Sequence, residues 1–147
     1  MAVVRCEAAP PTTASQGFLI EITPVVKGLA GRPEKFPMVG DQWSVGGEIL
    51  KWKPWLTFLG IKNLHKLTRL NSRYFLAKAE MNQPRAVYDL GGGTSASWKW
   101  LYRYGLHLPF VDAVYGNAAY VPVQPGGQWG VYVTFSGYLI RPIRGER

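Results

Sequence analysis

The segment Trp129–Phe135 reads WGVYVTF, and its apolar and polar side chains alternate in the manner of a half-buried strand. In an extended chain Val131, Val133 and Phe135 share one face, whereas the tyrosine and threonine between them share the other. Such a period of two is typical of an antiparallel sheet with one face against a core. The segment therefore predicts a core strand whose valines and phenylalanine point inward.

A second alternating segment lies near the start of the chain. In Phe18–Thr23 the isoleucines at 20 and 22 alternate with Glu21 and Thr23, and Pro24 is expected to stop the strand. Val3–Glu7 is β-branched and ends before two prolines, so it predicts another short strand within a loosely ordered N-terminal segment, residues 1–16.

Composition extends this prediction to the whole chain. The 147 residues include 17 Gly, 11 Pro, 6 Trp, 8 Tyr and 6 Phe, and 47% of them are hydrophobic. Frequent turns and bulky aromatic side chains favour sheet over a helix bundle, and this length suits one domain. The expected fold is therefore a single mainly β domain over residues 1–147, an antiparallel sandwich or open barrel with one short helix.

The other expected elements follow from local patterns. Ala96–Tyr104 predicts the helix, with Trp98, Leu101 and Tyr102 on one face and Lys99 and Arg103 on the other. The pair at 46–47 predicts either a hairpin turn or a bulge within one strand, and 55–61 predicts a short helix or a protruding loop. Further strands are expected at 86–90, 110–114 and 119–123, a loop at 27–37, and two strands within 64–80 that are separated by a turn at 71–72.

The chain is strongly basic. Its 17 Lys and Arg against 9 Asp and Glu give a formal net charge of +8, which attracts phosphate groups of nucleic acid or of anionic lipid. One cysteine, Cys6, excludes an internal disulfide, and two histidines offer little for a metal. The sequence predicts no catalytic residues, no metal site and no cofactor, and no segment of it is apolar and long enough to span a membrane.

A glycine run supplies the candidate anion-binding residues Gly91, Gly92, Gly93 and Thr94. Together with Asp89 it resembles the phosphate loop of the actin-like and heat-shock ATPase superfamily, in which backbone amides approach a nucleotide. The resemblance covers eight residues, and those ATPases need two large lobes that this length does not provide. A turn that leads into a helix cap is the better explanation of the glycines, and a nucleotide-dependent or hydrolytic enzyme at this turn stays an alternative.

Aromatic side chains bracketed by lysines give a candidate membrane surface. In the run KWKPWLTFLGIK, residues 51–62, tryptophan suits the boundary of a bilayer and lysine reaches the headgroups. The alternative is that the aromatic residues belong to the core while the lysines are solvated. The candidate residues are Lys51, Trp52, Lys53, Trp55, Phe58 and Lys62.

A second basic set predicts nucleic-acid binding as a further alternative. Basic and aromatic side chains interleave on one expected strand and helix, where they could stack bases and neutralise phosphates. The alternative is the wet face of a sheet. The set comprises His65, Lys66, Arg69, Arg73, Tyr74 and Lys78, with Trp98, Lys99, Trp100 and Arg103.

Four runs, 40–43, 49–56, 67–70 and 111–116, resemble a group of small, uncharacterised bacterial membrane-anchored proteins that often carry a label such as multidrug transporter or cation efflux pump. The resemblance extends from Gly40 to Ile140. It implies hydrophobic helices before this region, so that this chain would be the soluble domain, and it implies no catalytic residues. A β domain without a spanning helix offers no route for a substrate through a bilayer, so transport itself is not expected of this chain.

These patterns predict a non-catalytic, membrane-proximal binding or structural domain. Its expected partner is an anionic lipid surface or a membrane protein, and nucleic acid is the next choice. Membrane association through segments absent from this chain is expected, and otherwise a cytoplasmic location.

Overall fold

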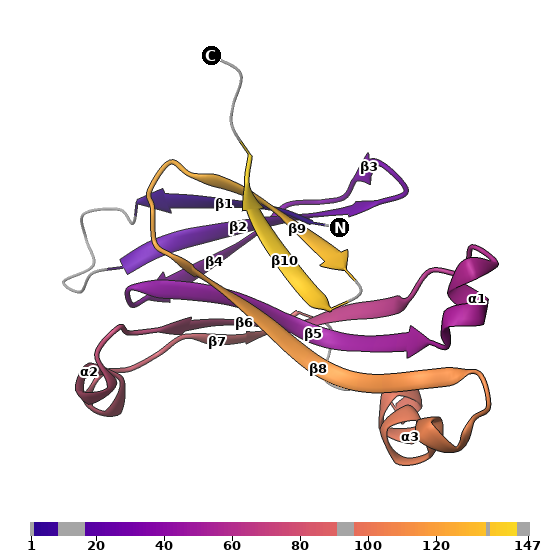
Figure 1. Cartoon of the computed structure of the whole chain (residues 1–147). Coiled ribbons are helices and arrows are strands. Elements are labelled where there is room, and N and C mark those ends of the chain that lie inside the picture. The colour runs from indigo at the N-terminus through magenta and orange to yellow at the C-terminus, as the bar shows by residue number, and fades with distance from the viewer. Residues whose placement is uncertain (1, 9–16, 91–95, 135, 144–147) are drawn as a thin grey trace.

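A computed structural model describes residues 2–8, 17–90, 96–134 and 136–143. Two antiparallel sheets dominate it, and three short helices lie at their ends and on one face (Figure 1). The predicted mainly β sandwich is therefore confirmed, although α1 and α2 join the one helix that was expected.

The first sheet has six strands in the order β10-β9-β1-β2, with β3 and β4 both on the remaining edge of β2. β1 lies in the interior of this sheet, paired with β2 on one side and with β9 on the other. The strands are β1 Ala2–Ala8, β2 Gly17–Val26, β3 Leu29–Ala30, β4 Glu34–Val39, β9 Gln128–Thr134 and β10 Gly137–Pro142.

The second sheet has four strands in the order β7-β6-β5-β8. The long central strand β5 pairs with β6 and β8 along nearly its whole length. The strands are β5 Gln42–Trp52, β6 Leu64–Arg73, β7 Val87–Asp89 and β8 Val111–Pro122.

Apolar side chains from the two sheets meet in one core. Trp43 of β5 and Trp129 of β9 pack edge to face, with ring centroids 5.5 Å apart, and so join the sheets directly. Val131 is buried in this core and Val133 packs against it, as the alternation predicted, while Phe135 lies outside the described residues. Other core residues include Val4, Cys6, Ile20, Ile22, Val45, Ile49 and Leu70.

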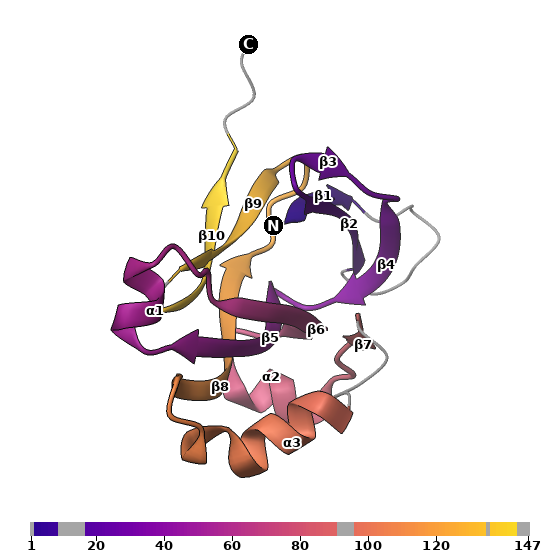
Figure 2. The same ribbon diagram turned by 90° about the vertical axis from the view of Figure 1, so that its right-hand side faces the viewer.

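Three helices complete the fold. α1, Pro54–Phe58, joins β5 to β6, and α2, Ala77–Asn82, follows β6 at the opposite end of that sheet. α3, Ala96–Tyr104, covers the face of the β5–β8 sheet that is turned away from the first sheet (Figure 2). There Leu101 packs with Leu50 and Val111 in a second, smaller cluster, whereas Lys99 and Arg103 are exposed as predicted.

Several local expectations were wrong. Residues 27–37 are not all loop, because β3 and the first part of β4 lie there. Asn71 and Ser72 do not form a turn but continue β6, and the second strand expected within 64–80 is replaced by α2. Strands 110–114 and 119–123 are one strand, β8. The glycine pair at 46–47 forms no hairpin turn but lies within the continuous strand β5, opposite a bulge whose extra residue is Thr68 of β6.

Residues 2–8 of the segment expected to be loosely ordered form β1, while 9–16 lie outside the described residues. The side chains of Trp98 and Tyr102 also lie outside what the structure describes.

Candidate functional site

The run of aromatic residues and lysines forms a short, well-defined helix with a loop. Pro54 occupies the first turn of α1, where its missing N–H costs nothing. At the other end the Gly60 N–H donates to the Thr57 carbonyl (3.0 Å) and the Ile61 N–H to the Leu56 carbonyl (3.2 Å), and Gly60 has φ +87°. This is the Schellman arrangement that closes a helix C-terminus. We call residues 53–63 the α1 loop.

The α1 loop is fastened to the body of the domain at its base. The indole N–H of Trp52 donates to the Lys62 carbonyl (3.0 Å), and the Trp52 backbone N–H donates to the side-chain oxygen of Asn63 (3.3 Å). The Lys53 N–H donates to the carbonyl of Phe110 (3.0 Å), whose ring lies 6.0 Å from that of Trp52. Trp52 thus stabilises the base of the α1 loop through these hydrogen bonds, which distinguishes it from the other aromatic candidates.

Most large apolar side chains of the α1 loop face solvent, and Leu56 is half-buried. No residue of α1 is buried, and the exposed fraction is 92% for Phe58 and 56% for Trp55. The alternative that these two residues belong to the core is therefore wrong. Three more large apolar side chains in or beside the loop are exposed, namely those of Leu59, Ile61 and Leu64. They were not among the candidates, although Leu59 and Ile61 belong to the same apolar run.

The lysines around the α1 loop differ in their surroundings. Lys51 forms an ion pair with Asp112 (Nζ to Oδ2, 3.3 Å), so its charge is partly neutralised. Lys53 precedes the first turn of α1 and Lys62 follows the loop's glycine, so the two lysines bracket the exposed aromatic residues in the sequence.

Two hollows flank α1. One, of about 410 Å³, lies between the loop and the end of β9 and is lined by residues that include Ile61, His65 and Val133. The other, of about 500 Å³, lies beside Trp52, Pro54 and Phe58. Thr57 of α1 lines both hollows, so the helix borders open space there.

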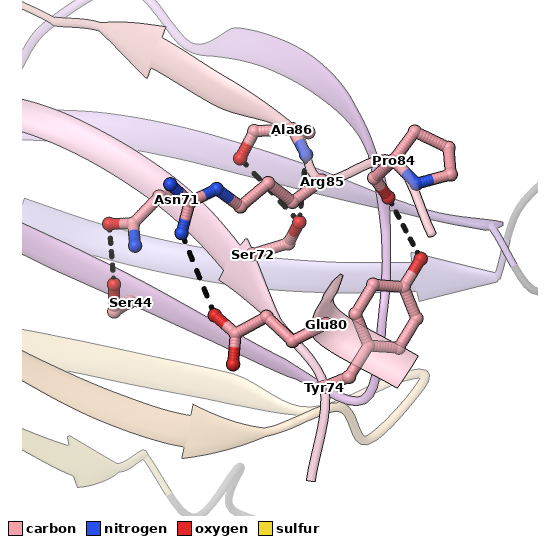
Figure 3. A network of polar contacts seen from close by, with 8 residues as sticks. All are labelled: Ser44, Asn71, Ser72, Tyr74, Glu80, Pro84, Arg85 and Ala86. Atoms are coloured by element: carbon pink, nitrogen blue, oxygen red, sulfur yellow. Dashed lines mark hydrogen bonds and ion pairs between the residues drawn. The ribbon is translucent and has the colours of Figure 1, made fainter. Parts of the chain in front are cut away.

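The basic set on β6 and α2 does not form an open stacking platform. Tyr74 is buried, and its hydroxyl donates to the Pro84 carbonyl (2.9 Å) in the network of Figure 3. In the same network Ser44 donates to Asn71 (2.7 Å) and Arg85 pairs with Glu80 (3.6 Å). These contacts hold the segment around α2 in place, and they remove Tyr74 from the residues that could stack on a base.

The remaining basic candidates are dispersed. The ring of His65 contacts Tyr138 at the edge of the first sheet, and burial lowers the pKa of this histidine, which favours its neutral form. Arg73 lies over the ring of Tyr120 (5.0 Å), whereas Lys78 is on α2 and Trp100 is on α3. The predicted residues are therefore spread along β6 and over α2 and α3.

The candidate anion-binding residues Gly91, Gly92, Gly93 and Thr94 lie outside the described residues. Asp89 ends β7, opposite Arg69 of β6. Within the described part of the chain, no three His, Cys, Asp or Glu side chains gather where they could hold a metal ion.

None of the helices in the described ranges is long and apolar enough to cross a bilayer. Comparison with known proteins adds no relative: no family model, no curated protein and no solved structure matches this chain.

Proposed function

We propose that this chain is a non-catalytic domain that docks on an anionic membrane surface through the α1 loop. The single observation that carries the proposal is the exposure of Trp55 and Phe58 on a helix whose two ends are both fixed. Burial in the core does not explain these side chains, because both are exposed and neither belongs to a core cluster. A rigid apolar projection beside lysines is the form expected of an interfacial anchor.

The fixed shape of the α1 loop favours binding. A loop that must order itself on contact loses about 0.5–1.5 kcal/mol for each immobilised side chain. Pro54, the glycine turn and the bond from Trp52 to Lys62 hold the loop before contact. More of the free energy gained by burying Trp55 and Phe58 is then available for binding.

Charge favours a lipid surface over an apolar protein surface as the partner. Lys53 and Lys62 bracket the aromatic residues in the sequence, and Asp112 is paired with Lys51. Lysines beside an anionic leaflet contribute about 1 kcal/mol each, and their long stems let the charge stay at the headgroups while the rings insert. Anchoring by segments outside this chain would add to the same contact and belongs to the proposal.

Vesicle binding tests the proposal. Trp55→Ala with Phe58→Ala should weaken partition onto vesicles of phosphatidylcholine and phosphatidylglycerol by about tenfold or more, because both rings are lost from the interface. The melting temperature should change little, since neither ring is buried.

The matched control is Phe75→Ala with Met81→Ala. These side chains are also exposed, but they lie beside and on α2 at the opposite end of the β5–β6 pair. The control should bind vesicles like the wild type. Equal losses in both double variants, or wild-type binding by the Trp55/Phe58 variant, would reject the α1 loop as the docking element.

A further inference from the structure

The turn between β2 and β3 is a second exposed apolar projection. Val26 pairs with Leu29, and the two residues between them, Lys27 and Gly28, have φ +51° and +81°. Positive φ at both central positions makes this a tight two-residue hairpin turn. Among the described residues, Lys27 is the one non-glycine with positive φ. Asparagine or aspartate is the usual residue at such a position, so a lysine there places a charge at the tip against local preference.

The two residues that close this turn are apolar and face solvent. The exposed fraction is 66% for Val26 and 76% for Leu29. Because they are directly opposite in the register, their side chains lie on the same face of the two-stranded ribbon. β3 is two residues long and borders only β2, so no further strand covers the pair. We call residues 26–29 the hairpin tip.

The hairpin tip and the α1 loop lie at the same end of the molecule. The hollow beside the α1 loop is lined by Ile61 and by Val133 of β9, so this end of β9 borders the loop. Two residues earlier, Val131 pairs with Ala2, and Ala2 in turn pairs with Pro24, just before the tip. Both projections are on the right in Figure 1, and Figure 2 views this end directly, with β3 above and α1 below it.

We propose that the hairpin tip is a second lipid-inserting element, which with the α1 loop fixes the orientation of the domain on an anionic bilayer. This inference rests on the proposed function of the α1 loop. Each projection carries large exposed apolar side chains with a lysine adjacent, Lys27 in one case and Lys53 and Lys62 in the other. An anionic lipid surface complements both, because it offers an apolar interior below a layer of negative charge. Two separated contacts restrict the tilt of the domain to rotation about the line that joins them, whereas one contact would leave the tilt unrestricted.

Site-specific fluorescence tests the orientation. The only cysteine, Cys6, is 1% exposed, and burial raises the pKa of its thiol, so a thiol-reactive dye added to the folded protein goes to a cysteine introduced at the surface. An environment-sensitive dye is attached to Leu29→Cys, to Phe58→Cys and, as the control, to Met81→Cys on α2, where the native side chain is 86% exposed. Each labelled protein is mixed with phosphatidylcholine and phosphatidylglycerol vesicles.

We expect a blue shift and an emission increase of about twofold or more at positions 29 and 58, and no change at position 81, because only the first two sites leave water. A response at 58 without one at 29 would overturn this inference and leave the α1 loop as the docking element. A response at 29 alone, or at none of the three, would overturn both proposals. Equal responses at all three positions would mean that the domain has no fixed orientation, which also overturns the inference.

Discussion

Gly60 decides how the α1 loop turns back toward β6. Its φ of +87° lies in the left-handed region, and an added Cβ would meet no atom within 4 Å. Glycine is therefore favoured at position 60 by the backbone conformation and not by a lack of space. A side chain with Cβ is disfavoured there, except that of asparagine, which tolerates this region.

Gly60→Ala should consequently lower the free energy of unfolding by about 1 kcal/mol. Gly60→Asn is the matched control and should lose clearly less, although its side chain is larger. Urea denaturation of both variants measures the difference. An alanine variant as stable as the wild type, or an asparagine variant that is the less stable of the two, would contradict the conformational explanation.

Within strand β5, glycine is required at position 47 for lack of space and not for its backbone conformation. The pairing of β5 with β6 shifts between Gly46 and Gly47, and an added Cβ at Gly47 would collide with the Lys66 carbonyl oxygen and lie 2.9 Å from the Leu67 Cα. Both of these atoms belong to the backbone of β6, which cannot move aside as a flexible side chain could. The bulge thus depends on a residue without a side chain.

Gly47→Ala should therefore destabilise the domain by about 2 kcal/mol or more, as overpacked core substitutions do. Gly28→Ala provides the comparison, because Gly28 has φ +81° but open space around it, so only the conformational cost of about 1 kcal/mol applies. If Gly47→Ala and Gly28→Ala unfold at the same urea concentration, the structure relieves the collision at the bulge, and lack of space does not explain the glycine at position 47.

Elements with regular alternation were predictable from the sequence, and elements held by distant partners were not. β1, β9 and the first part of β2 follow the alternation of their own residues, but β2 does not stop at Pro24 as expected and continues to Val26. β8 runs through Tyr115–Ala118, whose residues suggest a turn, because β5 pairs with it residue by residue across that stretch. A partner more than sixty residues away in the sequence leaves no local pattern to recognise.

The edge strand β4 was missed for a related reason. Proline is unusual in a strand, and Pro37 marked the segment as loop. β4 pairs only with β2, and its Pro37 carbonyl accepts a hydrogen bond from the Tyr88 hydroxyl (2.6 Å) of the other sheet. An edge strand tolerates the missing N–H of proline, so the expectation that proline marks a loop did not hold for β4.

At the scale of the whole molecule, the sequence predicted one of the two exposed apolar projections, the α1 loop, but not the hairpin tip. The pattern of lysines and aromatic residues at 51–62 gave the α1 loop from sequence alone, but it could not separate the bracing Trp52 from the exposed Trp55 and Phe58. The hairpin tip gave no signal, because Val26 and Leu29 are ordinary apolar residues until the fold brings them to the same end as α1.

The distribution of charge yields a prediction for the complete domain. With a net charge of +8, any anionic surface attracts this protein to some degree, so a loss of binding on removing charge does not by itself locate the contact. A comparison of two variants with the same net charge does. Lys53→Gln with Lys62→Gln removes the charges that flank the α1 loop, and Lys78→Gln with Lys99→Gln removes exposed lysines of α2 and α3.

The first pair should weaken partition onto phosphatidylglycerol-containing vesicles by roughly 30-fold, because two lysines near the surface contribute about 2 kcal/mol. The second pair should bind within about threefold of the wild type at physiological salt, where charges more than about 8 Å from the lipid are largely screened. Raising the salt concentration should reduce the difference in vesicle affinity between the two variants, since salt then also screens the lysines at the interface. Equal losses in the two variants would show that net charge alone drives binding, and that the end of the molecule bearing the α1 loop holds no special position on the membrane.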